Sequence, residues 1–499
     1  MDAAYAELKE RLAEIADLDG TSALLGWDQQ VKMPPGGAGV RAEQLATLGR
    51  LSHEALTSDE IGRLLDTLAT FAEEQPYDSD EASLIRIVRR DWEKARRVPA
   101  ELQAEIARAG SLAMPVWVQA RQESDYAAFI PSLRKNLDLR RRYVECFDDY
   151  DEPYDALLDD FEPGMKTAEV RSVFERLKEE QIPLVAGARS EGERPVRDPS
   201  FPIQRQQAFE LQVIRRFGYD PSEWRLDTAV HPFATSISIN DIRLTTRYDE
   251  GNLDGLFSTM HECGHGLYEH GVDQALERTP LASGASLALH ESQSRMWENL
   301  VGRSLPFWRH FYGDLRATYP ETLGGVELED WYRDVNWVEP SLIRVEADEL
   351  TYNLHIILRF ELEQELLAET VSLEELPEVW NERMNDYLGV RPPTDALGVL
   401  QDMHWAVGAI GYFSTYALGN VVSGQLWEKL NADLPDLADQ IEQGEFGDLA
   451  GWLRERLWRH GRKYMPRELL ERITGGGLDP EPYLRYLGEK YPVATTAAH

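Results

Sequence analysis

The pattern of hydrophobic and polar residues predicts a chain that is helical almost throughout. Apolar residues recur every three or four positions in segments far apart in the sequence, such as AYAELKERLAEIADL, AEVRSVFERLKEEQIPLV and ELTYNLHIILRFELEQELL. This spacing places the apolar side chains on one face of an α-helix. The sequence therefore predicts a mainly α fold.

One short stretch, at about residues 226–248, follows a different period. The peptides TSISI and IRLTTRY alternate and are rich in β-branched residues, and Asn240 and Asp241 stand between them. Alternation around such a turn is typical of a β-hairpin. We therefore expect a small antiparallel β-sheet here. An edge strand of this kind can pair with the backbone of an extended peptide, although a purely structural hairpin fits the pattern too.

The segment after the hairpin, NLDGLFSTMHECGHGLYEHG, has the apolar spacing of a helix. We expect Asn252 to cap its start and Gly271 to end it. His261 and His265 fall off the apolar stripe and are four residues apart, so both imidazoles point from the same side of the helix. Glu262 lies on the neighbouring strip of that side.

The peptide HECGH is the HExxH pattern of zinc hydrolases, whose usual chemistry is peptide-bond hydrolysis. Two imidazoles at this spacing can bind one metal ion, and the Glu between them can hold and deprotonate a water on that ion. A chain with 11 histidines in 499 residues is expected to show on the order of 0.03 such matches by chance. The motif therefore favours a metal site over two unrelated histidines on an amphipathic helix.

A catalytic zinc site needs a third protein ligand, and a second helical pattern, LALHESQSRMWENL, offers His290, Glu291 and Glu298. We predict Glu291, because two imidazoles and one carboxylate form a common hydrolytic ligand set. Two alternatives stay open: Glu291 pairs only with Arg295 one turn further on, or His290 is the ligand. The set suits Zn²⁺, and Co²⁺ can occupy the same geometry.

The chain carries a large excess of negative charge, with 88 Asp and Glu against 52 Lys and Arg and a net charge of −36. Such a surface repels nucleic acid and anionic membranes, so we expect neither as a partner. Acidic excess with few lysines predicts a halophilic protein adapted to molar salt, where charges are screened beyond ~3 Å. An ordinary acidic cytosolic enzyme is the alternative.

The sequence shows no clear linker, so we predict a single catalytic domain over residues 1–499. Its expected parts are N-terminal helices at about 1–220, a metal-site core at about 225–420 and C-terminal helices at about 421–499. No run of 18 apolar residues occurs, and the start lacks the basic and apolar regions of a signal peptide. We therefore expect a cytoplasmic protein.

HECGH followed by HESQ resembles the carboxypeptidase Taq family of metallocarboxypeptidases. Further segments that fit the family's pattern are HPF (231–233), DIRLT (241–245), IRVEAD (343–348), GVLQDMHW (398–405), GYFSTYALGN (411–420) and the N-terminal LLGWDQQVKMPPGGAGVRAEQLATL. The resemblance extends from about residue 5 to about residue 490. It implies a large two-lobed helical fold with a deep substrate groove, zinc at the groove's floor, a small sheet beside it, and a homodimer.

The resemblance also implies a zinc carboxypeptidase that releases single residues from peptides with a free C-terminus. Glu262 would be the general base and then the general acid. His404 and Tyr416 would stabilise the oxyanion, with Tyr412 as the second choice of phenol. Buried tyrosines are also common in protein cores, so a packing role fits both tyrosines as well.

A carboxypeptidase must bind the free carboxylate of its substrate, and an arginine fork fits a carboxylate. The family motifs imply Arg344 for this role, with Arg243 and His231 in support. Ordinary ion pairs of Arg344 with Asp348 and of Arg243 with Asp241 are the simpler alternatives.

Asp348 and Asp402 are both candidates for the carboxylates that orient the zinc histidines. Rival functions are an oligo-endopeptidase or dipeptidyl carboxypeptidase with the same site, and a non-catalytic peptide-binding protein. The two arginine motifs favour the exopeptidase, and an intact Glu262 between intact ligands argues against the last rival.

Overall fold

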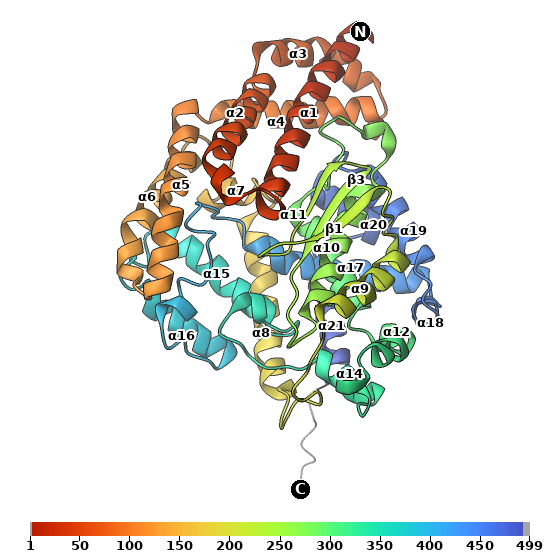
Figure 1. Ribbon diagram of the computed structural model, residues 1–499. Coiled ribbons are helices and arrows are strands. Elements are labelled where there is room, and N and C mark those ends of the chain that lie inside the picture. The colour runs from red at the N-terminus through yellow and green to blue at the C-terminus, as the bar shows by residue number, and fades with distance from the viewer. Residues whose placement is uncertain (1, 493–499) are drawn as a thin grey trace. The chain divides into compact units, whose positions relative to one another are not determined.

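The computed structural model describes residues 2–492, which form two compact units (Figure 1). Within the described residues, the first unit comprises 2–96, 195–335 and 426–475, and the second comprises 97–194, 336–425 and 476–492. The two units each take segments from widely separated parts of the sequence. The single catalytic domain stays a prediction.

The mainly α fold is confirmed in both units. The helices of the first unit are α1 (Asp2–Val31), α2 (Ala38–Leu56), α3 (Asp59–Glu74), α4 (Asp80–Arg97), α9 (Ile203–Phe217), α10 (Asp254–Gly271), α11 (Leu287–Arg295), α12 (Leu305–Thr318), α13 (Pro320–Leu323), α14 (Leu328–Val335), α18 (Leu437–Glu442), α19 (Gly447–Arg456) and α20 (Pro466–Thr474). Those of the second unit are α5 (Ala100–Glu123), α6 (Tyr126–Val144), α7 (Pro153–Leu158), α8 (Thr167–Ala188), α15 (Tyr352–Leu367), α16 (Leu376–Leu388) and α21 (Glu481–Lys490). Helix α17 (Ser414–Asp433) begins in the second unit, and its residues from Leu426 onward belong to the first.

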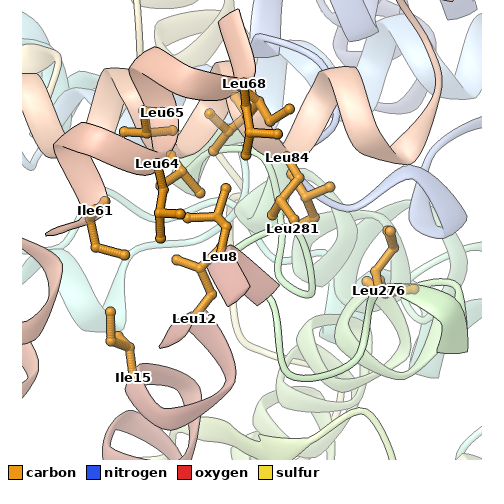
Figure 2. Close-up of a cluster of buried hydrophobic side chains, with 14 of the residues drawn as sticks. Leu8, Leu12, Ile15, Ile61, Leu64, Leu65, Leu68, Leu84, Leu276 and Leu281 are labelled. Carbon is orange, nitrogen blue, oxygen red and sulfur yellow. The ribbon is translucent and has the colours of Figure 1, made fainter. Parts of the chain in front are cut away.

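Helix α3 shows how local sequence and packing combine. Ser58 caps its start by accepting a hydrogen bond from the backbone N–H of Ile61, and two acidic residues occupy its first turn. Its buried face packs against α1 and α4 in a cluster that Figure 2 shows, with Leu8, Leu64 and Leu84 among its members. The burial of these side chains holds α1, α3 and α4 together.

The same cluster includes residues that follow the predicted metal helix, α10. Val272, Leu276 and Leu281 lie in the segment between α10 and α11, and all three are buried in it. The N-terminal helices therefore fasten the segment that leads to the third predicted ligand.

The sheet has three strands in the order β1-β3-β2. Strands β2 (Ala234–Ser238) and β3 (Asp241–Thr246) form the predicted antiparallel hairpin. Strand β1 (Trp224–Thr228) pairs with β3 in parallel, so the sheet is mixed rather than wholly antiparallel as expected. The peptide WRLDT lacks β-branched alternation, which is why its pattern did not predict a strand.

Helix α10 lies between the sheet and α11, and two glycines let it approach both (Figure 1). A Cβ added at Gly266 would lie 2.5 Å from the Trp224 ring, and one added at Gly264 would lie 2.6 Å from the backbone oxygen of Gln293. Both distances are too short for non-bonded atoms, so only glycine permits this packing. The helix begins at Asp254, one residue later than an Asn252 cap would give, and ends at Gly271 as predicted.

None of the helices within residues 2–492 has the length and apolar character needed to cross a lipid bilayer.

Candidate metal and catalytic site

Three side chains of the first unit converge as a metal site requires. The Nε2 atoms of His261 and His265, both on α10, lie 3.5 and 3.4 Å from the same oxygen, Oε2 of Glu291 on α11. The potential ligand atoms of the three residues all lie within 4.8 Å of one another. The structure thus brings together the two histidines and the carboxylate that the sequence predicted.

The two oxygens of Glu291 have different partners. Oε1 accepts a hydrogen bond from Nε of Arg295 at 2.7 Å, whereas Oε2 faces the two histidines. The ion pair that we considered as an alternative is therefore present together with the convergent geometry. Burial raises the pKa of Glu291, but the charges of Arg295 and His261 outweigh it and hold this pKa well below its usual range.

The environment of His265 favours a neutral imidazole. Burial and the neighbouring His290 lower its pKa to about 4. Neutral imidazoles offer the lone pair that a metal ion binds, and a carboxylate supplies compensating charge. The donor set of two imidazoles and one buried carboxylate therefore fits a divalent cation of the zinc type.

Glu262 lies on α10 between the two histidines and is buried. Burial raises the pKa of its carboxyl to about 7, with a further contribution from the negative charges of Glu291 and Glu298. A carboxyl with a pKa near neutrality can both accept and return a proton, as a general base and acid must.

The carboxylate that orients His261 is Glu298, which lies in a π-helical turn (Met296–Val301) directly after α11. Its Oε2 lies 2.8 Å from Nδ1 of His261, and Arg295 also contacts it, at 3.2 Å. The sequence offered Glu298 only as a candidate third ligand, and its position behind His261 was not predicted. Glu298 follows Glu291 by seven residues, about two helical turns, so both carboxylates lie on the same helical face. This spacing could have predicted that Glu298 lies near the metal site.

His265 contacts a second histidine, His290, rather than a carboxylate at its Nδ1 atom. The Nδ1 atoms of the two rings lie 2.6 Å apart, and Nε2 of His290 lies 2.7 Å from Oε1 of Glu269. His290 therefore contacts the nitrogen of His265 that faces away from Glu291. The third member of the convergent set is Glu291 and not His290, which was the alternative ligand.

A family model described as Carboxypeptidase Taq (M32) metallopeptidase matches residues 7–491. The chain belongs to this family. The resemblance that the motifs indicated is thus confirmed over nearly the whole sequence.

Relatives and solved structures agree with the M32 assignment. The thermostable carboxypeptidase 1 of Thermus thermophilus is 42% identical over 503 residues, which cover 98% of each chain. Carboxypeptidase 1 of Bacillus subtilis is 38% identical and covers 97% of each chain. The crystal structure of an M32 carboxypeptidase from Deinococcus radiodurans R1 is 42% identical and has a TM-score of 0.94, with coverage of 98% of this chain and 100% of that one. The chain is therefore a metallocarboxypeptidase, an enzyme that hydrolyses peptides.

The second unit of this M32 chain gathers the predicted residues Arg344 and Asp402 into one buried cluster. Asp402 accepts hydrogen bonds from Nη2 of Arg344 at 2.8 Å and from Nε of Arg359 at 2.7 Å. The ion-pair partner of Arg344 is thus Asp402 rather than Asp348. Asp348 instead accepts backbone N–H bonds, including that of Thr351. Arg359, which is fully buried on α15, was not predicted as part of this cluster.

The predicted oxyanion donors lie beside this cluster. Nδ1 of His404 is 3.7 Å from Oδ1 of Asp402, and its ring stacks on Tyr412 at a centroid distance of 5.2 Å. The Tyr416 hydroxyl donates to that of Tyr412 at 3.3 Å, and the Arg344 guanidinium lies 5.1 Å from the Tyr416 ring centroid. The predicted residues Arg344, Asp402, His404, Tyr412 and Tyr416 therefore share one environment within the second unit.

Arg243 and His231 belong to the first unit. Arg243, on β3, forms a two-pronged ion pair with Asp241, with both distances 2.9 Å, so the simpler alternative is present. His231 is exposed in the loop between β1 and β2. That loop is tied to the strand of Arg243, because the backbone N–H of Thr245 donates to the carbonyl of Phe233 at 2.9 Å.

Proposed function

We propose that this enzyme is a zinc-dependent carboxypeptidase that releases single amino acids from the C-termini of peptides. The observation that carries the proposal is the convergence of His261, His265 and Glu291 beside Glu262. When bound, Zn²⁺ supplies Lewis acidity, which polarises the scissile carbonyl and lowers the pKa of a water molecule. Co²⁺ suits the same donor set.

Glu262 accepts a proton from the attacking water and delivers it to the leaving amide nitrogen. Its pKa of about 7 supports both steps, because the carboxyl is neither permanently ionised nor permanently protonated near neutral pH. Glu298 holds the ring of His261, and Arg295 holds the free oxygen of Glu291. These contacts restrict the ligands to one arrangement.

We assign the stabilisation of the oxyanion to His404 and Tyr416, with Tyr412 as the alternative phenol. Burial is the main reason that the pKa of His404 is lowered, to about 4, and that the pKa of Tyr416 is raised. At neutral pH His404 is therefore a neutral imidazole and Tyr416 a neutral phenol, and each can donate a hydrogen bond to the oxyanion. The motif positions in the M32 family favour Tyr416 over Tyr412.

We assign recognition of the substrate's carboxylate to Arg344, supported by Arg243 and His231. Arg344 and Arg359 share the single carboxylate of Asp402, so these three residues together carry one surplus positive charge. A surplus charge among buried groups favours an anionic ligand. The Nε and Nη2 atoms of Arg243 already donate hydrogen bonds to Asp241. We therefore assign Arg243 a supporting role in binding the substrate's carboxylate.

The nearest rival is an oligo-endopeptidase or dipeptidyl carboxypeptidase that uses the same metal site. A non-catalytic peptide-binding protein is the more distant rival. We further propose that the enzyme acts as a homodimer in the cytoplasm at molar salt, on the basis of the family motifs and the net charge of −36.

Paired peptides test the proposed activity. One N-blocked peptide carries a free C-terminus and its twin is amidated; each is incubated with the enzyme in about molar KCl with Zn²⁺, with and without a chelator, and products are read by mass spectrometry. We expect stepwise loss of single residues from the free peptide alone. Equal internal cleavage of both twins would establish the endopeptidase, and no chelator-sensitive cleavage would support the binding protein.

A further inference from the structure

The second predicted metal histidine, His265, is backed by two residues whose function the M32 activity does not explain. His290 precedes Glu291 on α11, and its Nδ1 lies 2.6 Å from Nδ1 of His265. The other nitrogen of His290 lies 2.7 Å from Oε1 of Glu269, which is one helical turn beyond His265 on α10. The three side chains form a continuous line of hydrogen bonds within the first unit.

When Nε2 of a neutral His265 binds a metal ion, only one arrangement of protons satisfies every bond in this line. Nε2 of His265 faces Oε2 of Glu291, so in a neutral ring that binds metal through Nε2 the proton sits on Nδ1. That proton is donated to Nδ1 of His290, which must then be unprotonated. The remaining proton of His290 is on Nε2, where Glu269 accepts it.

Glu269 is itself held from two sides. Its Oε1 accepts the backbone N–H of Gly284 at 3.1 Å, and its Oε2 accepts the hydroxyl of Ser236, on β2, at 3.3 Å. A Cβ added at Gly284 would lie 2.7 Å from Cδ2 of His290, so a glycine here makes room for the ring. Glu269 is therefore a fixed acceptor at the end of the line.

We propose that His290 and Glu269 are positioning residues for His265. Together they fix the tautomer and the orientation of its ring, so that Nε2 presents its lone pair to the metal ion. The ring of His261 is held directly by one carboxylate, because Oε2 of Glu298 lies 2.8 Å from its Nδ1. The inference rests on the metal site of the proposed function. His290, the histidine of the HESQ motif, then orients a metal ligand and does not bind the metal itself.

Metal binding by the whole chain tests this proposal without recourse to activity. The Zn²⁺ affinity of the metal-free protein is measured by competition with a chromophoric chelator, and the visible spectrum of the Co²⁺-loaded protein reports the ligand geometry. The variants are His290→Phe, which removes both bonds, and His290→Asn, whose Oδ1 lies where Nδ1 of the histidine was. Thermal unfolding of each metal-free variant is recorded alongside.

We expect His290→Phe to bind Zn²⁺ about 10 to 100-fold more weakly, which is the usual loss when the partner of a metal ligand is removed. Its Co²⁺ bands should shift. His290→Asn should recover most of the affinity and the original bands, because it again accepts the proton of His265. The matched control is His270→Phe: His270 lies on the same helix, contacts the carbonyl of Ile239 and is outside the line of bonds. We expect it to bind Zn²⁺ as the unaltered chain does.

Unchanged affinity and bands in His290→Phe would overturn the proposal, and so would equal losses in the Phe and Asn variants. If His290→Phe does not fold, Glu269→Leu decides, since it removes the terminal acceptor and leaves both imidazoles; a loss of about tenfold supports the proposal and no loss overturns it. An unaltered chain that binds no Zn²⁺ would overturn the proposed function itself.

Discussion

Two neighbouring carboxyl groups of the candidate site have opposite electrostatic environments. Glu291 lies against Arg295 and two imidazoles, which keep it an anion. Burial raises the pKa of Glu262 to about 7, with a smaller contribution from the neighbouring carboxylates Glu291 and Glu298. Environment rather than residue type therefore separates the charged ligand from the group that exchanges protons.

The variant Glu262→Gln tests this division of roles. The amide keeps the size of the side chain but cannot accept a proton, so we expect kcat to fall by about 10² to 10⁴-fold. Zn²⁺ content should match that of the unaltered enzyme, as measured by atomic absorption, and calorimetry should show that the variant is folded. An active Glu262→Gln enzyme would contradict the proposed mechanism.

Single residues also show where sequence reasoning stops. His261 and His265 were predictable because helical spacing fixes how residues within one short segment face one another. Glu291, on the next helix, was predictable from chemistry, because two imidazoles and one carboxylate form a common zinc ligand set. The partners of Arg344 were not predictable. Asp402 is 58 residues further along the chain, and the backbone N–H of Arg344 donates to Gln401, a residue with no role in the sequence analysis. Such pairs depend on tertiary packing, which no local pattern records.

At the scale of elements, the approach of α10 to α11 sets the distance between the histidines and Glu291. We expect Gly264→Ala to lower the free energy of unfolding by about 1–3 kcal/mol, because the added methyl meets the backbone of α11. It should also weaken Zn²⁺ binding, since the ligands are pushed apart.

The control for this substitution is Gly313→Ala on α12, where nothing lies within 4 Å of an added Cβ. Alanine there should raise stability by up to about 1 kcal/mol through helix propensity. Chemical unfolding measures both variants. Equal effects of the two substitutions would show that close packing of α10 against α11 at Gly264 does not limit stability.

Helix α9 is connected to α10 by a hydrogen bond between the carboxyl of Glu210 and Thr259. Oε2 of Glu210 accepts the hydroxyls of Tyr248 and Thr259, and burial raises the pKa of Glu210 to about 7. Its Oε1 has no hydrogen-bond partner within residues 2–492. Ionisation of this carboxyl in the folded state is therefore unfavourable.

Because the folded pKa of Glu210 lies above the usual value of 4.5, the folded state holds this proton more tightly than the unfolded state does. Its contribution to stability is complete below about pH 4.5 and is lost as the pH rises through about 7. We expect Glu210→Gln to unfold at a higher temperature than the unaltered chain at pH 8, and at a similar temperature at pH 5. A difference that does not depend on pH would contradict this account.

At the scale of the whole molecule, the net charge of −36 opposes compactness. Exposed ion pairs such as Arg50–Glu54, with both side chains 58% exposed, offset little of this repulsion. We expect the melting temperature to rise steeply with KCl up to molar concentrations, because salt screens the repulsion between carboxylates. Differential scanning calorimetry at a series of salt concentrations measures this. Full stability and activity after dialysis into dilute buffer would contradict the halophilic interpretation.

The interleaving of segments also constrains how the protein is made. The predicted metal ligands, between residues 261 and 291, leave the ribosome well before Trp458, which packs against both of the helices that carry them. Trp458 packs at Gly271, the last residue of α10, and its indole donates to Gln293 of α11. Both units need segments from beyond residue 425. At translation rates of about 5–20 residues per second, a growing chain must hold an unfinished metal site for many seconds, which gives chaperones a task here that they do not have in proteins whose domains follow one another in order.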